Sequence, residues 1–399
     1  MWEKAIDVHQ VLELRTATRV FFGAGAVEKI EVVAAEMAAA GIKSVLVVTG
    51  HSAYRRTGAW DRVEAALNNH GVKFAIFDKV TPNPTTEQVD EAAKLGFETG
   101  AAAVIAIGGG SAIDAGKSAA ILLANPGHDA RELYEYRFIP AKAAPIAAIN
   151  LTHGTGSETN RLAVVSILEK QYKPAIAYDC IYPTWAIDDP ALTVALPPNQ
   201  TRYVSVDAVN HVIEAATTKV AGPLTALLGK ETVRLVAKYL PSAIADGGDI
   251  TARYFLHYAS MIAGVSFDNG MLHYTHALEH PLSAVKPDLA HGLGLAVLLP
   301  AVLRQIYVAR PAVLADVLSP IVANLSGVPA EADAAADGVR SWLASVGIRE
   351  RLGDLGLKKG DMETLTRLAF ETPSLKGLLD MAPTEATPAV VRQIYEDSF

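Results

Sequence analysis

The chain has 399 residues, of which half are apolar and a fifth are charged, and a chain of this length usually forms about two domains. Its formal net charge of −8 argues against nonspecific nucleic-acid binding, which depends on clustered positive charge. The sequence contains no apolar run of the roughly 18 residues that a membrane span needs and no basic-then-apolar start of the kind that signals secretion. Cys180 is the single cysteine, so no internal disulfide can form. We therefore expect a cytoplasmic protein without a nucleic-acid or membrane partner.

Short apolar runs alternate with amphipathic stretches in the first half of the chain. The predicted strands are residues 44–49, 74–77 and 102–107. Between them, residues 60–69 and 86–99 have apolar side chains at helical spacing. Strands that alternate with helices are typical of a parallel sheet with crossover helices. We therefore predict an α/β domain over residues 1–188.

A glycine turn at residues 108–111 follows the third predicted strand, and an apolar helical run follows the turn. Glycine lets the backbone approach a ligand closely, and the N-terminus of a helix favours a phosphate. Ser111 is the candidate cap of this helix, with Asp114 three residues on. A second loop, residues 152–158, follows another apolar segment and offers hydroxyl groups and backbone amides. Both loops are candidates for binding a dinucleotide, although tight-turn geometry alone also explains some glycine runs.

The character of the sequence changes near Asp189. Strand-like runs disappear, and residues 204–218 and 223–240 predict long helices rich in alanine and leucine. Prolines cluster at the change, and proline ends regular elements because it restricts the residue before it. We therefore predict a second, helical domain over residues 189–399.

Four histidines and an aspartate in this second half have the spacing of a metal site. Asp207 and His211 are four residues apart, as are His276 and His280, so each pair lies on one face of a helix. His291 follows, directly before a glycine. Imidazoles with one carboxylate suit Fe(II), Zn or another divalent metal and leave coordination positions open. A lone buried histidine is more often a structural residue, but five suitable residues together predict a metal site.

In chain order, these motifs resemble the iron-containing, group III alcohol dehydrogenase family over nearly the whole chain. The matching segments are residues 23–25, 82–85, 108–117, 154–158, 189–198, 207–215, 276–282 and 291–292. The resemblance implies a dehydroquinate synthase-like fold, in which a Rossmann-like parallel-sheet domain binds NAD(P)(H) and an all-helical domain binds the metal. It also implies a homodimer or larger homo-oligomer that acts on a small alcohol or aldehyde.

The resemblance assigns roles residue by residue. The implied ligands of a catalytic divalent metal, most characteristically Fe(II), are Asp207, His211, His276 and His291. His280 matches a family histidine that lies near the metal and cofactor and is the candidate for relaying a proton. The cofactor-binding candidates are Gly50, Asn83, Gly108, Gly109, Gly110, Ser111, Asp114, Thr152, Thr155 and Lys173. The implied reaction is hydride transfer between NAD(P)(H) and a small primary alcohol or aldehyde, in which the metal acts as a Lewis acid on the alcohol oxygen.

The chain departs from the family's common pattern after the first predicted strand. Gly50 stands where many members have an aspartate that bonds the adenosine ribose and repels a 2′-phosphate. Arg55 and Arg56 follow and add positive charge that suits a phosphate. The sequence therefore favours NADP(H). The alternative is that both arginines are solvated surface residues and that glycine permits both cofactors.

Two further histidines, His153 and His273, also stand where other residues are common in the family. Together with Lys286 they predict a pocket for a polar or anionic aldehyde, and the alternative is that both histidines are hydrogen-bonded packing residues. Two other interpretations of the whole chain stay open. One is a glycerol dehydrogenase-like enzyme that oxidises a polyol with Zn, and the other is a metal- and nucleotide-binding protein without turnover.

Overall fold

The structure, a computed structural model, describes residues 10–399. The chain divides into two compact units. One unit comprises Thr16–Leu196 and Gly247–His257, and we call it the sheet unit. The other comprises residues 10–15, Pro197–Asp246 and Tyr258–Phe399, and we call it the helical unit. The assignment of residues 1–188 to dinucleotide binding and of residues 189–399 to metal binding stays a prediction.

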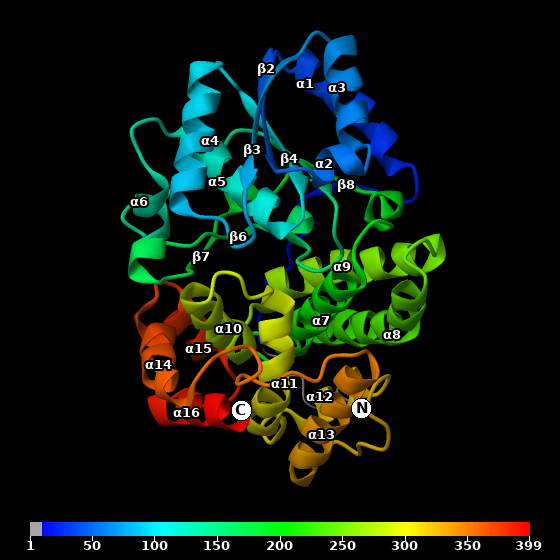
Figure 1. Cartoon of the computed structure of the whole chain (residues 1–399), viewed down its shortest axis with the longest axis vertical. Helices are drawn as coiled ribbons and strands as arrows, with labels where there is room; N and C mark the ends of the chain where they lie inside the picture. The colour runs from blue at the N-terminus through cyan, green and yellow to red at the C-terminus, as the bar shows by residue number, and fades with distance from the viewer. Residues whose placement is uncertain (1–9) are drawn as a thin grey trace. The chain divides into compact units, whose positions relative to one another are not determined.

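A six-stranded parallel sheet forms the centre of the sheet unit, with the strand order β1-β8-β5-β4-β2-β3 (Figure 1). The strands are β1 (Arg19–Phe22), β2 (Ser44–Gly50), β3 (Lys73–Val80), β4 (Ala103–Gly108), β5 (Ile146–Asn150) and β8 (Trp185–Asp188). β6 (Leu162–Val164) and β7 (Ala175–Ala177) form a separate antiparallel pair. The three central strands are buried along almost their whole length, which explains their continuous apolar sequences.

Helices cover both faces of this sheet (Figure 1). On one face, α1 (Ile30–Ala39) and α3 (Ala59–Asn69) share a core with alternate residues of β2 and β4. On the other face, α4 (Thr86–Glu98) and α5 (Gly110–Ala124) pack against the intervening residues. Two short helices, α2 (Ala53–Arg56) and α6 (Ala130–Tyr134), complete the unit. The predicted α/β architecture is therefore confirmed.

The helical unit contains no strand among its described residues. Its helices are α7 (Pro198–Ala215), α8 (Pro223–Ala245), α10 (Tyr274–Val285), α11 (His291–Tyr307), α12 (Pro311–Leu318), α13 (Ala332–Ser345), α14 (Met362–Glu371), α15 (Leu375–Met381) and α16 (Pro388–Asp397). α9 (Ile250–Gly270) contributes residues to both units. Within residues 10–399, no helix has both the length and the apolar character for crossing a membrane.

Two contacts within this unit position the candidate site. α7 packs against α11, and α11 packs against α10. A Cβ atom at Gly292 would lie 2.0 Å from the Tyr203 carbonyl oxygen, so the start of α11 can approach α7 this closely only with glycine at this position. Asp207 on α7, His276 on α10 and His291 on α11 therefore belong to helices that are in contact.

Candidate metal centre and nucleotide-binding loops

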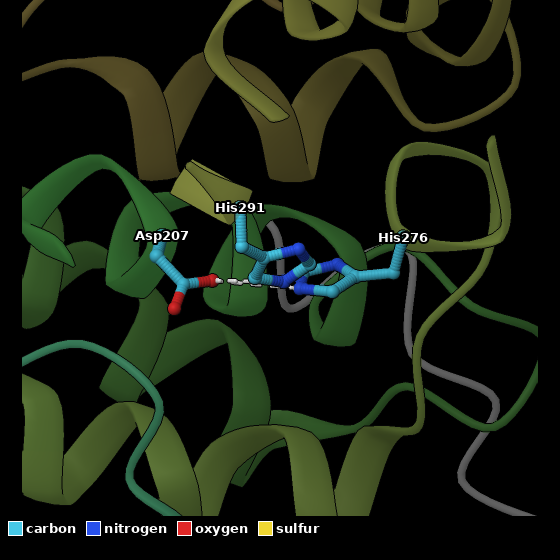
Figure 2. Close-up of side chains that lie close together, drawn as sticks. All are labelled: Asp207, His276 and His291. Carbon is cyan, nitrogen blue, oxygen red and sulfur yellow. Dashed lines mark ion pairs between the residues drawn. The ribbon is translucent and has the colours of Figure 1, made fainter. Parts of the chain in front are cut away.

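The Asp207 carboxylate faces the rings of His276 and His291 in the predicted metal site (Figure 2). Its Oδ1 atom is 3.5 Å from His211 Nε2, 3.6 Å from His276 Nε2 and 3.9 Å from His291 Nε2. These distances are too long for hydrogen bonds. They suit ligands of one metal, which lie about 2.1 Å from the ion and therefore about 3 to 3.5 Å from one another. Three imidazoles thus lie around Asp207, and the tighter group, whose ligand atoms all lie within 4.8 Å of one another, consists of Asp207, His276 and His291 without His211.

The donor atoms of this group fit a divalent cation. Asp207 Oδ1 and His276 Nε2 are buried without a hydrogen-bond partner. A buried polar atom left unpaired costs about 1 to 3 kcal/mol, and native structures contain few of them. A divalent ion between these atoms would satisfy both, since carboxylate oxygen and imidazole nitrogen suit Fe(II) and Zn. The His291 side chain is 26% exposed while that of Asp207 is 4% exposed, so the group is open to solvent on the side of His291.

Two glutamates that the sequence analysis did not assign hold two of the histidines. His276 Nδ1 contacts the Glu214 carboxylate, and His291 Nδ1 contacts the Glu279 carboxylate. When Nδ1–H donates to a carboxylate, the lone pair stays on Nε2, which here faces Asp207. Glu214 lies seven residues after Asp207, on the same helix face, and this spacing could have indicated it from the sequence.

The charges in this group depend on one another. Burial lowers the pKa of His211 to about 4. Burial acts on His276 in the same direction, but the carboxylates of Glu214 and Asp207 outweigh it and raise the pKa of His276 to about 9. Burial raises the pKa of Glu214, but His276 and His273 outweigh that effect and lower it to about 2. The pKa of Asp207 is also lowered, against burial, chiefly by His211. Both carboxylates are therefore anionic at neutral pH, and a metal would have to displace the proton that His276 carries without one.

His280 lies one turn beyond His276 on α10 and is buried. Its ring centroid is 6.4 Å from that of His276 and 5.8 Å from that of His291. His280 also forms a possible ligand group with Glu279 and His291, but the Glu279 carboxylate is already in contact with His291 Nδ1. The Asp207 group is therefore the stronger candidate for holding a metal, and His280 lies beside it. Its role in proton relay stays a prediction.

His273 is a packing residue rather than a wall of an anion pocket, which corrects one of the two interpretations from the sequence. It is fully buried and forms the N-cap of α10. Its Nδ1 accepts a hydrogen bond from the Tyr274 amide at 2.7 Å, and its Nε2 is 2.9 Å from Thr217 Oγ1. Because both ring nitrogens have partners inside the protein, His273 cannot bind a substrate anion. His153 is also fully buried.

The burial of His273 predicts an acid-sensitive contribution to stability. Burial lowers its pKa to about 4 from the ordinary 6.5, so the folded protein favours the neutral imidazole. The stability from this preference is complete above the unfolded-state pKa and is lost as pH falls toward the folded-state pKa. Lowering the pH from about 7 to about 5 should reduce the free energy of unfolding of the metal-free wild-type protein. We expect this reduction to be about 2 kcal/mol smaller in His273→Asn.

Urea titrations with chelator present, at a series of pH values, measure this difference. The control is Leu227→Ala, which replaces an exposed, nonionisable side chain and should keep the wild-type pH dependence. Buried histidines that do not interact with His273 contribute equally to all three proteins and cancel in the comparison. The same pH slope for His273→Asn and wild type would contradict the prediction.

The predicted nucleotide-binding loops touch each other in the sheet unit. A Cβ atom at Gly110 would lie 2.5 Å from Thr155 Cγ2, and one at Gly109 would lie 2.8 Å from Thr152 Cγ2. Only glycine allows the two loops to approach this closely. The candidate residues of both loops therefore lie at one place.

The prediction that Ser111 caps the helix after the glycine turn is wrong. α5 begins at Gly110, two residues earlier than a cap at Ser111 would place it, and its N-cap is Gly109, without a side-chain cap hydrogen bond. Gly110 can directly follow the turn as the first residue of the helix, because it has no side chain that would clash with Thr155. Ser111 thus lies in the first turn of α5, where the positive end of the helix dipole favours a phosphate.

Asp114 contacts protein groups rather than open space. Its carboxylate accepts hydrogen bonds from Ser157 Oγ at 2.5 Å and from the Val164 amide at 2.9 Å. Lys117 Nζ donates to Ser157 Oγ at 2.9 Å and to the Leu162 carbonyl at 2.7 Å. These bonds tie the segment after the second loop to α5. Asp114 would therefore support a cofactor site by holding this loop.

The remaining cofactor candidates also lie in the sheet unit. The strand order reverses between β2 and β4, and Gly50 and Gly108 are the last residues of these two strands. In open α/β sheets, ligands bind beyond the carboxyl ends of the strands at such a reversal. Asn83 follows β3 with a φ of 53°, and Lys173 is buried in the connection between β6 and β7.

The arginines after Gly50 differ in their surroundings. The Arg55 guanidinium lies over the rings of Tyr54 and Trp60, 4.9 and 5.9 Å from their centroids, and its Nε donates to the Tyr54 hydroxyl at 2.8 Å. Arg56 is exposed. Both arginines lie in α2, directly after the end of β2, so their positive charge is close in sequence to the site of the missing aspartate.

Comparisons with known proteins agree with this architecture. One family description, iron-containing alcohol dehydrogenase, matches residues 17–190, and another, Fe-containing alcohol dehydrogenase family, C-terminal, matches residues 201–399. The chain is 57% identical to long-chain primary alcohol dehydrogenase AdhA of Thermoanaerobacter ethanolicus over 399 residues, which are 100% of both proteins.

Solved structures are similar over almost the whole chain as well. NADH-dependent butanol dehydrogenase A of Thermotoga maritima matches with a TM-score of 0.89 and 27% identity, covering 97% of this chain and 98% of that one. The archaeal halo-thermophilic Red Sea brine pool alcohol dehydrogenase ADH/D1 matches with a TM-score of 0.88 and 27% identity, covering 98% and 100%. These similarities confirm the predicted fold class in both units.

Proposed function

Since the chain belongs to the iron-containing alcohol dehydrogenase family, we propose that it transfers hydride between NAD(P)(H) and a primary alcohol or aldehyde. The observation that carries the proposal is the Asp207 carboxylate oxygen, which three imidazole nitrogens face within 3.9 Å. A bound Fe(II) or Zn ion would act there as a Lewis acid on the alcohol oxygen. The 57% identity to a long-chain primary alcohol dehydrogenase supports primary alcohols as the substrate class. We place this activity in a cytoplasmic homodimer or larger homo-oligomer.

Different residues of the chain would bind the metal, transfer the proton and bind the cofactor in this reaction. The ion would be held by Asp207, His211, His276 and His291. The alcohol loses a proton as well as a hydride, and a ring nitrogen of His280 would carry that proton toward solvent. Gly109, Gly110, Thr152 and Thr155 would hold the dinucleotide phosphates at the start of α5. The hydride itself passes between substrate and nicotinamide without a covalent bond to the protein.

NADP(H) is the preferred cofactor in this proposal. Gly50 brings no carboxylate to the end of β2, and Arg56 and Ser52 are exposed in the segment that follows, where they would bond a 2′-phosphate. The neighbouring strand β3 does contain a carboxylate, that of Asp78. Its Oδ2 accepts a hydrogen bond from the Tyr54 hydroxyl at 3.4 Å. A single charge-assisted bond contributes about 1.5 to 3 kcal/mol, so we expect a preference on the order of tenfold or more, with NAD(H) also accepted.

Reduction of aldehydes by anaerobically purified protein tests the proposal. We expect primary aldehydes to drive NADPH oxidation, NADH to support a lower kcat/KM, and a chelator to abolish turnover until Fe(II) or Zn is restored. Faster oxidation of glycerol than of primary alcohols would favour the polyol alternative. An anionic aldehyde belongs in the panel because of Lys286, although His273 no longer supports that substrate class. No turnover with any metal or substrate would favour a binding protein without catalysis.

A further inference from the structure

We propose that Glu214 and Glu279 are positioning residues that set how tightly the helical unit binds its metal. Each acts through one histidine, Glu214 through His276 and Glu279 through His291. The inference rests on the proposed function only in taking the Asp207 group as a metal site. Its test reads metal affinity and metal geometry, which do not depend on turnover.

Glu214 fixes both the backbone and the ring of one ligand. It lies on α7 and is fully buried. Its Oε1 accepts hydrogen bonds from the backbone amides of His273, Thr275 and His276 at 3.0, 2.8 and 3.3 Å. Its Oε2 contacts His276 Nδ1. The amides at the start of a helix have no partner within the helix, so this one carboxylate both caps α10 and turns His276 toward Asp207.

Glu279 lies on α10 itself and holds the other ligand, His291. It is fully buried, and its carboxylate contacts Ser283 Oγ one turn on and His291 Nδ1 at the start of α11. A Cβ atom at Gly294 would lie 2.9 Å from Glu279 Cγ. Glycine at this position in α11 thus leaves room for the glutamate. Glu279 therefore links α10 to the first residue of α11, which is itself a ligand.

His211 shows what a ligand in this site is like without such a carboxylate. Its ring stacks on Phe267, with 4.3 Å between centroids, and on His276, with 4.6 Å. Its Nδ1 is buried without a hydrogen-bond partner, so only packing and the approach of its Nε2 to Asp207 set the angle of its ring. A carboxylate, by contrast, fixes the tautomer and makes the imidazole a stronger donor to a cation. Glu214 and Glu279 supply both effects to two of the three histidines.

Removal of each carboxylate in two steps tests the proposal. Gln at position 279 keeps the size of the side chain and a hydrogen-bond acceptor, whereas Ala removes both. We expect Zn affinity to fall about tenfold in Glu279→Gln and about 100-fold in Glu279→Ala, the range seen when such outer partners of ligands are replaced. Glu214→Gln should also weaken binding about tenfold. Competition with a chromophoric chelator measures the dissociation constant, and the d–d spectrum of the Co(II) protein reports ligand geometry.

The matched control is Glu231→Gln on α8, which removes a surface glutamate paired with Arg234 and should keep wild-type affinity and spectrum. Unchanged Zn affinity and an unchanged Co(II) spectrum in both Glu279 variants would overturn the proposal. If Glu279→Ala does not fold, judged by circular dichroism, Glu279→Gln and Gly294→Ala decide the matter. Gly294→Ala should weaken metal binding, because its methyl group displaces Glu279 without removing the charge.

The same measurements separate this inference from the proposed function. A wild-type protein that binds Zn tightly but turns over no substrate would refute the dehydrogenase activity. The Zn affinities of the Glu279 variants would still decide whether Glu279 sets metal affinity. A wild-type protein that binds neither Fe(II), Zn nor Co(II) would refute both. Weaker binding in the Glu279 variants with normal binding in Glu231→Gln would support the inference in either case.

Discussion

Asp207→Asn is expected to lower the rate of aldehyde reduction by at least about 10³-fold, because a catalytic metal supplies several kcal/mol and each 1.4 kcal/mol is tenfold in rate. The amide has the shape of the carboxylate but no negative charge, and an NH₂ group in place of an oxygen would point at the imidazole nitrogens that now lie 3.5 to 3.9 Å from Oδ1. We therefore expect the purified variant to contain little metal. Elemental analysis after dialysis, together with steady-state rates at saturating Fe(II), measures both effects.

A control for this substitution is Asp316→Asn on α12, which removes a carboxylate paired with Lys230 at the surface of the same unit. It should keep the wild-type metal content and rate. Circular dichroism should show wild-type helix content for both variants, since the amide fits where the carboxylate lies. Wild-type metal content and turnover in Asp207→Asn would show that Asp207 is not a ligand.

The second large effect is expected at the glycine turn. We predict that Gly110→Ala weakens binding of NADPH and NADH by about 100-fold, because losing a hydrogen bond to a charged phosphate costs about 1.5 to 3 kcal/mol and each 1.4 kcal/mol is tenfold in affinity. The added Cβ would lie 2.5 Å from Thr155 Cγ2, so the two loops must separate. That separation would move Thr155 and the start of α5 away from the phosphates. Fluorescence titration of the reduced nucleotides measures the dissociation constants directly.

A second glycine on the same helix provides the control. A Cβ atom at Gly116 would lie 2.7 Å from Ala106 Cβ, so Gly116→Ala should destabilise the sheet unit to a similar degree. Gly116 lies on the side of α5 that packs on β4, away from the turn. We expect its nucleotide affinity to stay within about threefold of wild type, since the contact concerns packing only. Equal losses of affinity in both variants would mean that the glycine turn has no specific role.

The long buried strands could be predicted from the sequence and the short ones could not. Continuous apolar runs predicted β2 and β4 because both faces of these strands are buried, and the run at residues 74–77 predicted part of β3. β1 and β8 have only four residues each, which is too short for a periodic pattern. The start of α7 was also not predicted, because its first turns are polar and have no apolar periodicity. The helix begins at Pro198, whereas the sequence pattern placed its start at residue 204.

The parts of the candidate site in which ligands share one helix face could be predicted from the sequence. The parts that depend on contacts between helices could not. The spacing of Asp207 and His211 on one helix indicates convergence without any tertiary information. The role of Glu279 depends on contact between α10 and α11, which no spacing within α10 reveals. His273 shows the opposite error, since a histidine next to a metal motif suggested a ligand pocket while its hydrogen bonds form a helix cap.

Selection is expected to act differently on the two glutamates that hold the ligand histidines. Glu214 accepts three backbone hydrogen bonds at the start of α10, and the chain needs these bonds to fold whether or not it binds a metal. Glu279 contacts Ser283 and the ligand His291, and without a cation nearby its charge would be buried at a cost in stability. In descendants that abandoned metal chemistry, Glu214 should therefore persist while position 279 becomes apolar. The residues at positions 214 and 279 of a related sequence would then indicate whether that protein still depends on a metal.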